Sequence, residues 1–195
     1  MAHISSLCVY CGSSNTVPAS HKDAAARLGH ALAKAAISLV YGGGRVGLMG
    51  IMADAALAAG GRVIGVIPRH LVQAEVGHGS VSELHIVSSM HERKQKMFEL
   101  SDAFAILPGG LGTLDELFEM LTWRQLRLHD KPIVIVDQGG YWAPLLALID
   151  AIEADGYAKG TKERLLEVVD GVDALLPALA RAREPVLPAA SARKL

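Results

Sequence analysis

The amino-acid sequence predicts an α/β protein in which helices cover both faces of a mainly parallel sheet. Short apolar and β-branched runs alternate with helix-length amphipathic segments along the first 154 residues, a rhythm typical of parallel sheets. Two of the runs, AFAIL at 103–107 and IVIV at 133–136, are apolar without interruption, as expected of strands buried on both faces. The chain of 195 residues, 51% hydrophobic and 20% charged, is long enough for one domain with a substantial core.

The predicted elements alternate between strand and helix from residue 6 onward. Strands are expected at the short apolar or β-branched runs, at 6–10, 38–41, 62–67, 84–87, 103–107 and 132–136. Helices are expected where alanine, leucine or methionine recurs at helical spacing, at 20–36, 48–59, 89–100, 114–128 and 141–154. Beyond residue 150 the pattern becomes helical, and two further helices are predicted at 162–169 and 172–183. We expect residues 1–183 to form a single domain and residues 184–195, which show no apolar period, to form a flexible tail.

Charge and composition argue against several classes of protein. Nineteen Lys and Arg residues balance twenty Asp and Glu residues, so the net charge is −1, and without a basic stripe we expect no nucleic-acid partner. The first Lys or Arg is Lys22, so the basic segment of a signal peptide is missing, and the apolar stretches are shorter than the ~18 residues of a membrane helix. Two cysteines make no disulfide framework. These features predict a cytoplasmic protein that has no membrane partner.

The first of two glycine-rich turns lies between a predicted strand and a predicted helix. Gly42, Gly44 and Gly47 fit the pattern G-x-G-x-x-G, in which glycines let backbone amides approach an anion at the helix N-terminus. A dinucleotide site also needs an acidic residue about 20 positions further on, but the next strand ends in VIPRH. The turn therefore indicates either an anion site or close packing of the helix on the strand.

The second glycine-rich turn, LPGGLGTLDE at 107–116, also leaves a buried strand and enters a helix. Three glycines within four positions, Gly109, Gly110 and Gly112, expose successive N–H groups, and Thr113 adds a hydroxyl. Such a nest suits a phosphate monoester. Neither turn continues into Gly-Lys-Ser/Thr, which argues against a triphosphate site of the P-loop type.

Glu116 permits two interpretations. Thr113 and Glu116 match the S/T-x-x-E capping box, in which the glutamate satisfies a backbone amide at the helix start. A carboxylate one turn beyond a phosphate nest also lies within reach of a sugar carried by that phosphate. Loss of a cap costs ~0.5–2 kcal/mol of stability, whereas loss of a catalytic carboxylate abolishes turnover and leaves the fold intact.

Arg93 stands within the apolar stripe of the predicted helix at 89–100. At 100° per residue it lies within ~60° of Met90, Met97 and Leu100, while Lys94 is on the flank of the stripe. Burial of an unpaired charge is expensive. Either the aliphatic part of the side chain packs while the guanidinium reaches water, or the guanidinium faces the crevice. In the crevice it would bind phosphate or pair with Glu116, both of which suit a planar, permanently charged group.

Other polar residues give weaker signals. Cys8 and Cys11 form a C-x-x-C along a strand, whereas a redox pair places its thiolate at a helix N-terminus, so Cys8 is predicted to be a core residue. No second pair completes a zinc site, and we expect no bound metal. Gly12, Ser13 and Ser14 leave the first strand at the edge where the crevice is expected.

Two segments carry a resemblance to a known family. SMHERK at 89–94 and PGGLGTLDE at 108–116 resemble the paired signatures of the LOG (LONELY GUY) family. The similarity continues through CVYCGSS, YGGGRVGLMG, VIGVIP and LTWRQLRLHDKP to about residue 180. Members of this family are cytokinin riboside 5′-monophosphate phosphoribohydrolases and are often mislabelled as lysine decarboxylases. Nothing in this sequence identifies a Schiff-base lysine or a pyridoxal phosphate site.

The resemblance implies a Rossmann-like three-layer α/β/α fold, a homodimer, and a nucleoside 5′-monophosphate substrate. The implied reaction hydrolyses the N-glycosidic bond of adenosine 5′-monophosphate, plain or N6-substituted, to the free base and ribose 5-phosphate, without a cofactor. Arg93 and Glu116 are the implied catalytic pair. The implied substrate contacts are Glu75, Met90, Arg93, Lys94, Gly109, Gly110, Leu111, Gly112, Thr113, Leu114, Asp115 and Thr122. Relatives often have Glu where Asp115 stands.

Two other functions remain as alternatives. A non-catalytic carrier of a nucleotide or of the molybdenum cofactor has similar glycine turns, but it does not need Arg93 and Glu116 together. An NAD-dependent oxidoreductase is a more distant alternative because the carboxylate for the ribose is missing.

Overall fold

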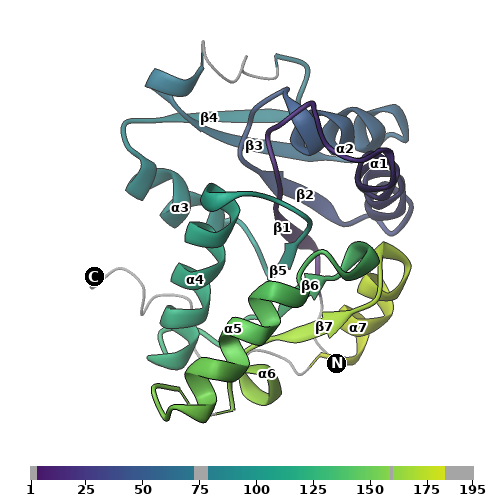
Figure 1. Cartoon of the computed structure of the whole chain (residues 1–195). Helices are drawn as coiled ribbons and strands as arrows, with labels where there is room; N and C mark the ends of the chain where they lie inside the picture. Colours follow the sequence, from purple (N-terminus) through teal and green to yellow (C-terminus); the bar gives the residue numbers. More distant parts are fainter. Residues whose placement is uncertain (1–3, 73–78, 159, 183–195) are drawn as a thin grey trace.

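A seven-stranded sheet in the order β4-β3-β2-β1-β5-β6-β7 forms the centre of the protein (Figure 1). The computed structural model describes residues 4–72, 79–158 and 160–182. The strands are β1 (Ser6–Tyr10), β2 (Ser38–Tyr41), β3 (Val63–Pro68), β4 (Glu83–Val87), β5 (Ala103–Ile106), β6 (Ile133–Val136) and β7 (Glu167–Val169). Each pair of neighbouring strands is parallel, which confirms the predicted sheet.

The strand order reverses at β1. From β1 the chain builds outward through β2, β3 and β4, then returns to the other side of β1 with β5 and continues through β6 to β7. In open parallel sheets, ligands bind at the carboxyl ends of the strands beside such a reversal. The fold therefore places the preferred binding crevice between the loops that follow β1 and β5.

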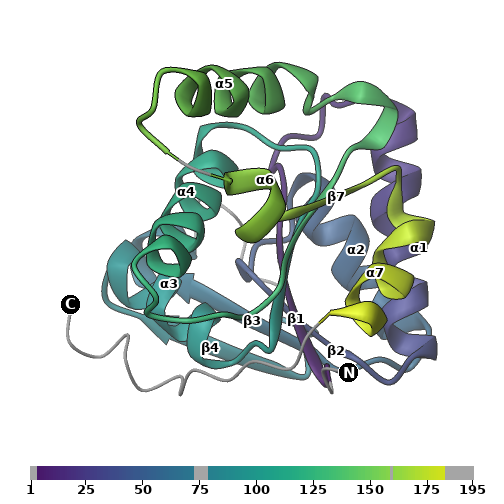
Figure 2. The same ribbon diagram turned by 90° about the horizontal axis from the view of Figure 1, so that it is seen from below.

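Helices cover both faces of this sheet (Figure 2). The helices are α1 (Ala19–Lys34), α2 (Gly47–Ala58), α3 (Met90–Glu99), α4 (Leu111–Gln125), α5 (Ala143–Ala154), α6 (Thr161–Arg164) and α7 (Leu175–Arg181), with 3-10 turns η1 (Arg69–Leu71), η2 (Gln138–Gly140) and η3 (Val172–Ala174). Helices α1, α2 and α7 pack on one face, where Leu7 and Val9 of β1 are buried. Helices α3, α4 and α5 pack on the other, where Cys8 and Tyr10 are buried. The three-layer arrangement expected from the resemblance is confirmed.

The predicted strands agree with the structure to within one residue at each end, but the helix predicted at 162–169 is wrong. That segment contains the single turn α6 and then the strand β7, which pairs with β6 through Ile135 opposite Val168 and Val136 opposite Val169. Pairing with the exposed edge of β6 overrides the local helical pattern. The predicted tail at 184–195 lies outside the described residues.

The helix predicted at 114–128 begins three residues earlier, at Leu111, a difference that matters for the site. The helix predicted at 172–183 is η3 followed by α7. In the part of the chain that the structure describes, no helix combines the length and hydropathy needed to span a bilayer.

The buried His129 contacts both α3 and α4, which pack on the same face of the sheet. The ring of His129 packs against Phe98 at 5.2 Å between centroids. Its Nδ1 accepts a hydrogen bond from the backbone N–H of Lys131 at 3.1 Å, so Nε2 carries the proton and donates to the carbonyl of Met120 at 3.0 Å. Burial lowers the pKa of His129 to about 4, so the ring is neutral near pH 7.

The pH dependence of stability tests this assignment. Between the unfolded pKa of 6.5 and the folded pKa of about 4, the unfolded chain binds more protons than the folded one. The free energy of unfolding is therefore expected to fall by up to about 3 kcal/mol as the pH decreases through this window. Urea unfolding of the wild type and of His129→Gln at several pH values measures the effect, and the variant should lose most of that slope. His30→Gln, at an exposed position on α1, is the control; identical slopes in all three proteins would contradict the assignment.

Candidate active site

A cavity of about 200 Å³ opens at the carboxyl edge of the sheet, beside the reversal at β1. Its walls come from the end of β1 with the loop that follows, from the loop after β2, from α2 and α3, and from the first turns of α4. Gly12 and Ser13 line it as expected, whereas Ser14 does not, and Arg93 and Glu116 also line it. The loops after β1 and β5 meet closely here, because the Gly12 N–H donates to the Pro108 carbonyl at 3.0 Å.

The position of Arg93 is set by the cap of α3. Ser89 is the N-cap and its hydroxyl accepts the N–H of Glu92 at 3.1 Å. Glu92 Oε2 in turn accepts the N–H of Ser88 at 2.7 Å and its hydroxyl at 2.6 Å. This S-x-x-E segment is a capping-box sequence that our sequence analysis overlooked. It fixes the first turn of the helix, on which Arg93 lies.

The guanidinium of Arg93 is buried, with 6% of the residue exposed. Its Nε donates to the carbonyl of Val66 and its Nη2 to the carbonyl of Gly42, each at 3.2 Å. Its Nη1 lies 3.8 Å from Glu116 Oε1. The interpretation in which the side chain extends to water is therefore wrong, and the structure instead brings Arg93 and Glu116 together.

The capping-box interpretation of Glu116 is also wrong. Because α4 begins at Leu111 with Gly110 as its N-cap, Thr113 lies inside the first turn and is not the N-cap. Glu116 is 8% exposed, lines the cavity and lies beside the guanidinium of Arg93. Its carboxylate therefore belongs to the cavity, while its catalytic role remains a prediction.

The N-terminus of α4 forms one wall of the cavity. Gly110, Leu111, Gly112 and Thr113 all line it, and the N-cap is a glycine, which has no side chain to accept the first amides. The first N–H groups of a helix have no acceptor within the helix, and the helix dipole adds positive potential there. This wall suits an anion such as a phosphate monoester.

The first glycine-rich turn is built differently. The amides at the start of α2 are already bonded, with Gly47 N–H donating to Asn15 Oδ1 at 2.9 Å and Leu48 N–H donating to the Gly12 carbonyl at 3.0 Å. Gly47 has a φ of +67°, and a Cβ there would overlap the backbone at Ser13 and Ser14. Gly47 therefore allows α2 to pack closely against the loop after β1, and close packing was one of the two interpretations of this turn.

Gly42 belongs to the same turn and leaves room for the side chain of Arg93. A Cβ on Gly42 would overlap Nη2 of Arg93, whose hydrogen bond goes to the Gly42 carbonyl. The missing side chain therefore makes room for the guanidinium. The sequence pattern indicated glycines here, but it did not connect them with an arginine 51 positions away.

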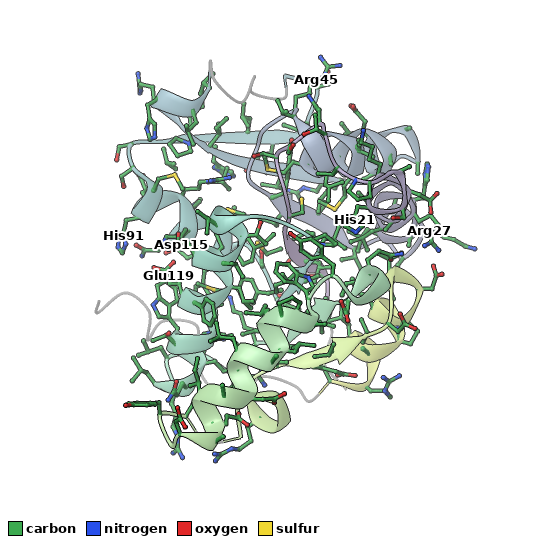
Figure 3. All side chains as sticks on the ribbon, viewed as in Figure 1. His21, Arg27, Arg45, His91, Asp115 and Glu119 are labelled. Carbon is green, nitrogen blue, oxygen red and sulfur yellow. The ribbon has the colours of Figure 1, made fainter. Side chains whose placement is uncertain are left out.

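The other predicted substrate contacts are placed less uniformly. Met90 lines the cavity. Lys94 bridges α3 to α4, with Nζ 3.1 Å from Asp115 Oδ2 and 3.2 Å from Glu119 Oε2; Figure 3 shows the two acidic residues side by side on α4. The predicted contacts that the structure describes but does not place in the cavity lining are Lys94, Gly109, Leu114, Asp115 and Thr122. Glu75 lies outside the described residues, and the binding roles of all these residues remain predictions.

The two cysteines lie on opposite faces of the sheet and are not a redox pair. Cys8 is fully buried among the residues under α3 and α4, which confirms the prediction of a core residue, whereas Cys11 belongs to the other core cluster. Burial is the main cause that raises the pKa of both thiols far above the usual value. Cys11 also lines the cavity, a position that the C-x-x-C pattern does not indicate.

Comparison with known proteins establishes the family. The family described as "Possible lysine decarboxylase" matches residues 49–179. A probable cytokinin riboside 5′-monophosphate phosphoribohydrolase of Oryza sativa subsp. japonica is 49% identical over 82% of this chain and 72% of its own length. The chain belongs to the LOG family. Another LOG protein, the cytokinin riboside 5′-monophosphate phosphoribohydrolase LOG1 of Arabidopsis thaliana, is 46% identical over 82% of this chain and 75% of its own length.

Solved structures that resemble this LOG protein share its fold at low sequence identity. The molybdenum cofactor carrier protein of Chlamydomonas reinhardtii superimposes with a TM-score of 0.70 at 20% identity, covering 92% of this chain and 97% of the carrier. The molybdenum cofactor binding protein of Rippkaea orientalis gives 0.69 at 19% identity, covering 91% and 96%. At this identity the similarity describes the Rossmann-type architecture alone.

Substitution of Gly42 tests the space made for Arg93. Gly42→Ala is expected to lower the free energy of unfolding by about 1–3 kcal/mol, the usual cost of overpacking a buried site. In a background that removes both charges, Arg93→Ala with Glu116→Gln, the same change should cost about 1 kcal/mol less, because the overlapping Arg93 atoms are gone and the other close atom, Met49 Sδ at 3.1 Å, ends a flexible side chain. Urea denaturation of the four proteins measures the coupling, and Gly79→Ala, where a Cβ meets open space, is the control. Equal costs in both backgrounds would contradict the packing role.

Proposed function

We propose that this LOG-family protein hydrolyses the N-glycosidic bond of adenosine 5′-monophosphates, including N6-substituted ones, and releases the free base and ribose 5-phosphate. With an N6-substituted substrate the released base is a cytokinin. The observation that carries the proposal is the buried pair of Arg93 and Glu116, 3.8 Å apart, in a cavity bounded by the N-terminus of α4. The names of the 44–49% identical relatives agree with this reaction.

The geometry suggests how the substrate lies. The 5′-phosphate occupies the anion site at the start of α4, where backbone amides hold it. Glu116 follows Leu111 by five residues, or about 7.5 Å along the helix axis, so a ribose on that phosphate extends toward the carboxylate. Binding of the phosphate, which does not react, thereby aligns the bond that breaks.

The chemistry follows from the position of the carboxylate. As the C1′–N9 bond breaks, its electron pair leaves with the base and positive charge develops on the ribose, as in glycoside hydrolysis. The carboxylate of Glu116 stabilises that charge and orients a water molecule. The water oxygen bonds to C1′, and its protons end on the sugar hydroxyl and the departing base. Arg93 offsets the cost of burying the carboxylate and fixes its position.

The direct test is hydrolysis by the purified chain. AMP and isopentenyladenosine 5′-monophosphate are incubated with the protein, and free adenine or isopentenyladenine is measured by chromatography. Release of either base supports the proposal, and a larger kcat/KM for the isopentenyl substrate assigns a preference for cytokinin nucleotides. Nucleotide recovered intact after overnight incubation with a folded protein that binds it would favour the carrier alternative and overturn the proposal.

Glu116→Gln and Arg93→Ala test the assignment of the catalytic pair. Each is expected to lower kcat by about 100-fold or more, because the change removes the charge closest to the developing cation or its positioning partner. Glu167→Gln is the control, since it makes the same change in β7, where the side chain pairs with Arg181 and does not line the cavity. Circular dichroism shows whether each variant is folded, and near-wild-type turnover by folded Glu116→Gln would remove Glu116 from the mechanism.

We further propose a cytoplasmic homodimer. The two free, buried cysteines suit a reducing compartment. Large apolar side chains are exposed at the start of α3 (Met90, 37%), at the start of α4 (Leu111, 86%) and just after its end (Leu126, 61%), and association with a second copy would remove such side chains from water. Light scattering of the purified chain should give twice the monomer mass of 20.6 kDa, and Leu126→Glu should shift the value toward the monomer. A monomeric wild type would overturn this part of the proposal.

A further inference from the structure

Three consecutive carbonyl groups in the turn before α4 are each held by a different donor. The Pro108 carbonyl accepts the Gly12 N–H at 3.0 Å, and the Gly110 carbonyl accepts the Leu114 N–H at 3.1 Å. The Gly109 carbonyl between them accepts the hydroxyl of Tyr141 at 2.7 Å. The outer two bonds come from the backbone and follow from the fold. The middle bond comes from a side chain 32 residues away, and a single substitution can remove it.

The middle bond holds the peptide between Gly109 and Gly110, at the border of the cavity. A trans peptide is planar, so its C=O and N–H point in opposite directions. The hydroxyl that holds the Gly109 carbonyl therefore also fixes the direction of the Gly110 N–H. Gly110 lines the cavity, whereas Gly109 does not. Because this peptide lies between two glycines, whose backbone conformations are the least restricted, it would rotate readily without that bond.

The chain after β6 is shaped to bring Tyr141 to this position. Gly139 and Gly140 have φ values of +66° and +77° and reverse the chain direction. The loop is closed by the Trp142 N–H, which donates to Asp137 Oδ1 at 2.7 Å, and the Trp142 side chain is buried with 3% exposed. Tyr141 is thus anchored by the residue next to it and reaches across to the turn before α4.

Burial alone does not explain a tyrosine here. Tyr141 is 41% exposed, and its ring makes edge-on contacts with His21, labelled on α1 in Figure 3, at 5.3 Å and with Trp142 at 4.8 Å. A phenylalanine would keep both ring contacts. The group that distinguishes tyrosine is the hydroxyl, whose hydrogen bond goes to the turn that borders the cavity.

We propose that Tyr141 is a positioning residue for the substrate phosphate, because its hydroxyl holds the Gly109–Gly110 peptide with the N–H directed at the anion site. The inference rests on the proposed function in that it takes the phosphate of a nucleoside 5′-monophosphate to occupy the N-terminus of α4. Tyr141 acts through the peptide and not by contact with the substrate. It is therefore expected to affect binding of the phosphate more than cleavage of the glycosidic bond.

Tyr141→Phe in the full-length chain tests the proposal. Its Kd for ribose 5-phosphate, measured by calorimetry, should rise about 3- to 10-fold, the ratio that corresponds to one hydrogen bond. With AMP as substrate, KM should rise by a similar factor while kcat changes less than about 2-fold, the pattern of an interaction made equally in the ground and transition states. Tyr157→Phe removes a hydroxyl from another exposed tyrosine, 84% exposed, and should leave Kd, KM and kcat unchanged.

The outcomes separate this inference from the proposed reaction. A Tyr141→Phe protein with unchanged Kd and KM overturns the positioning role, as does one whose melting temperature falls while both constants stay at wild-type values. If the wild type binds ribose 5-phosphate and the variant binds it more weakly, but neither cleaves AMP, the positioning role stands and the proposed reaction fails. A folded wild type that does not bind ribose 5-phosphate overturns the phosphate site and the inference with it.

Discussion

The site depends on the burial of two opposite charges. The side chains of Arg93 and Glu116 are 7% and 10% exposed, and removal of charged groups from water is stabilising overall only when each finds partners in the interior. Arg93 has two such partners in the carbonyl of Gly42, just after β2, and the carbonyl of Val66 in the neighbouring strand β3. A parallel sheet presents those carbonyls at the same edge, so the architecture itself compensates the buried cation, and the cation lies next to the carboxylate.

Two helix N-termini meet at this edge, and they have different tasks. The first amides of α2 donate to the Asn15 side chain and to the Gly12 carbonyl, so they hold the loop after β1 in place. The start of α4 has a glycine N-cap and borders the cavity. Similar glycine-rich sequences therefore give a tightly packed turn in one place and a cavity wall that suits an anion in the other. The difference is that Asn15 and Gly12 accept the amides at the start of α2.

The central strands could be predicted closely because an apolar run buried on both faces leaves a strong local pattern. The segment at 162–169 could not, because whether it pairs as β7 depends on the free edge of β6 and not on its own periodicity. For the site, the sequence drew attention to Arg93 and Glu116, whose types and positions conflict with a plain amphipathic helix and a plain cap. It left their roles open, because the start of α4 at Leu111, which excludes the capping box, depends on how the turn after β5 packs.

By itself the sequence determined the class of fold, the presence of two glycine-rich turns at strand ends, and the two charged residues that needed an explanation. The tertiary structure decided which helix start borders the cavity and that Arg93 donates to the carbonyls of Gly42, just after β2, and of Val66 in β3. It also decided that Lys94 pairs with Asp115 and Glu119 and that Tyr141 reaches Gly109. The physical reason is that apolar periodicity is a local property of the chain. A buried charge instead needs polar partners, and a buried amide needs a hydrogen-bond acceptor. In this protein those partners are distant in sequence and meet only when the strands align in register.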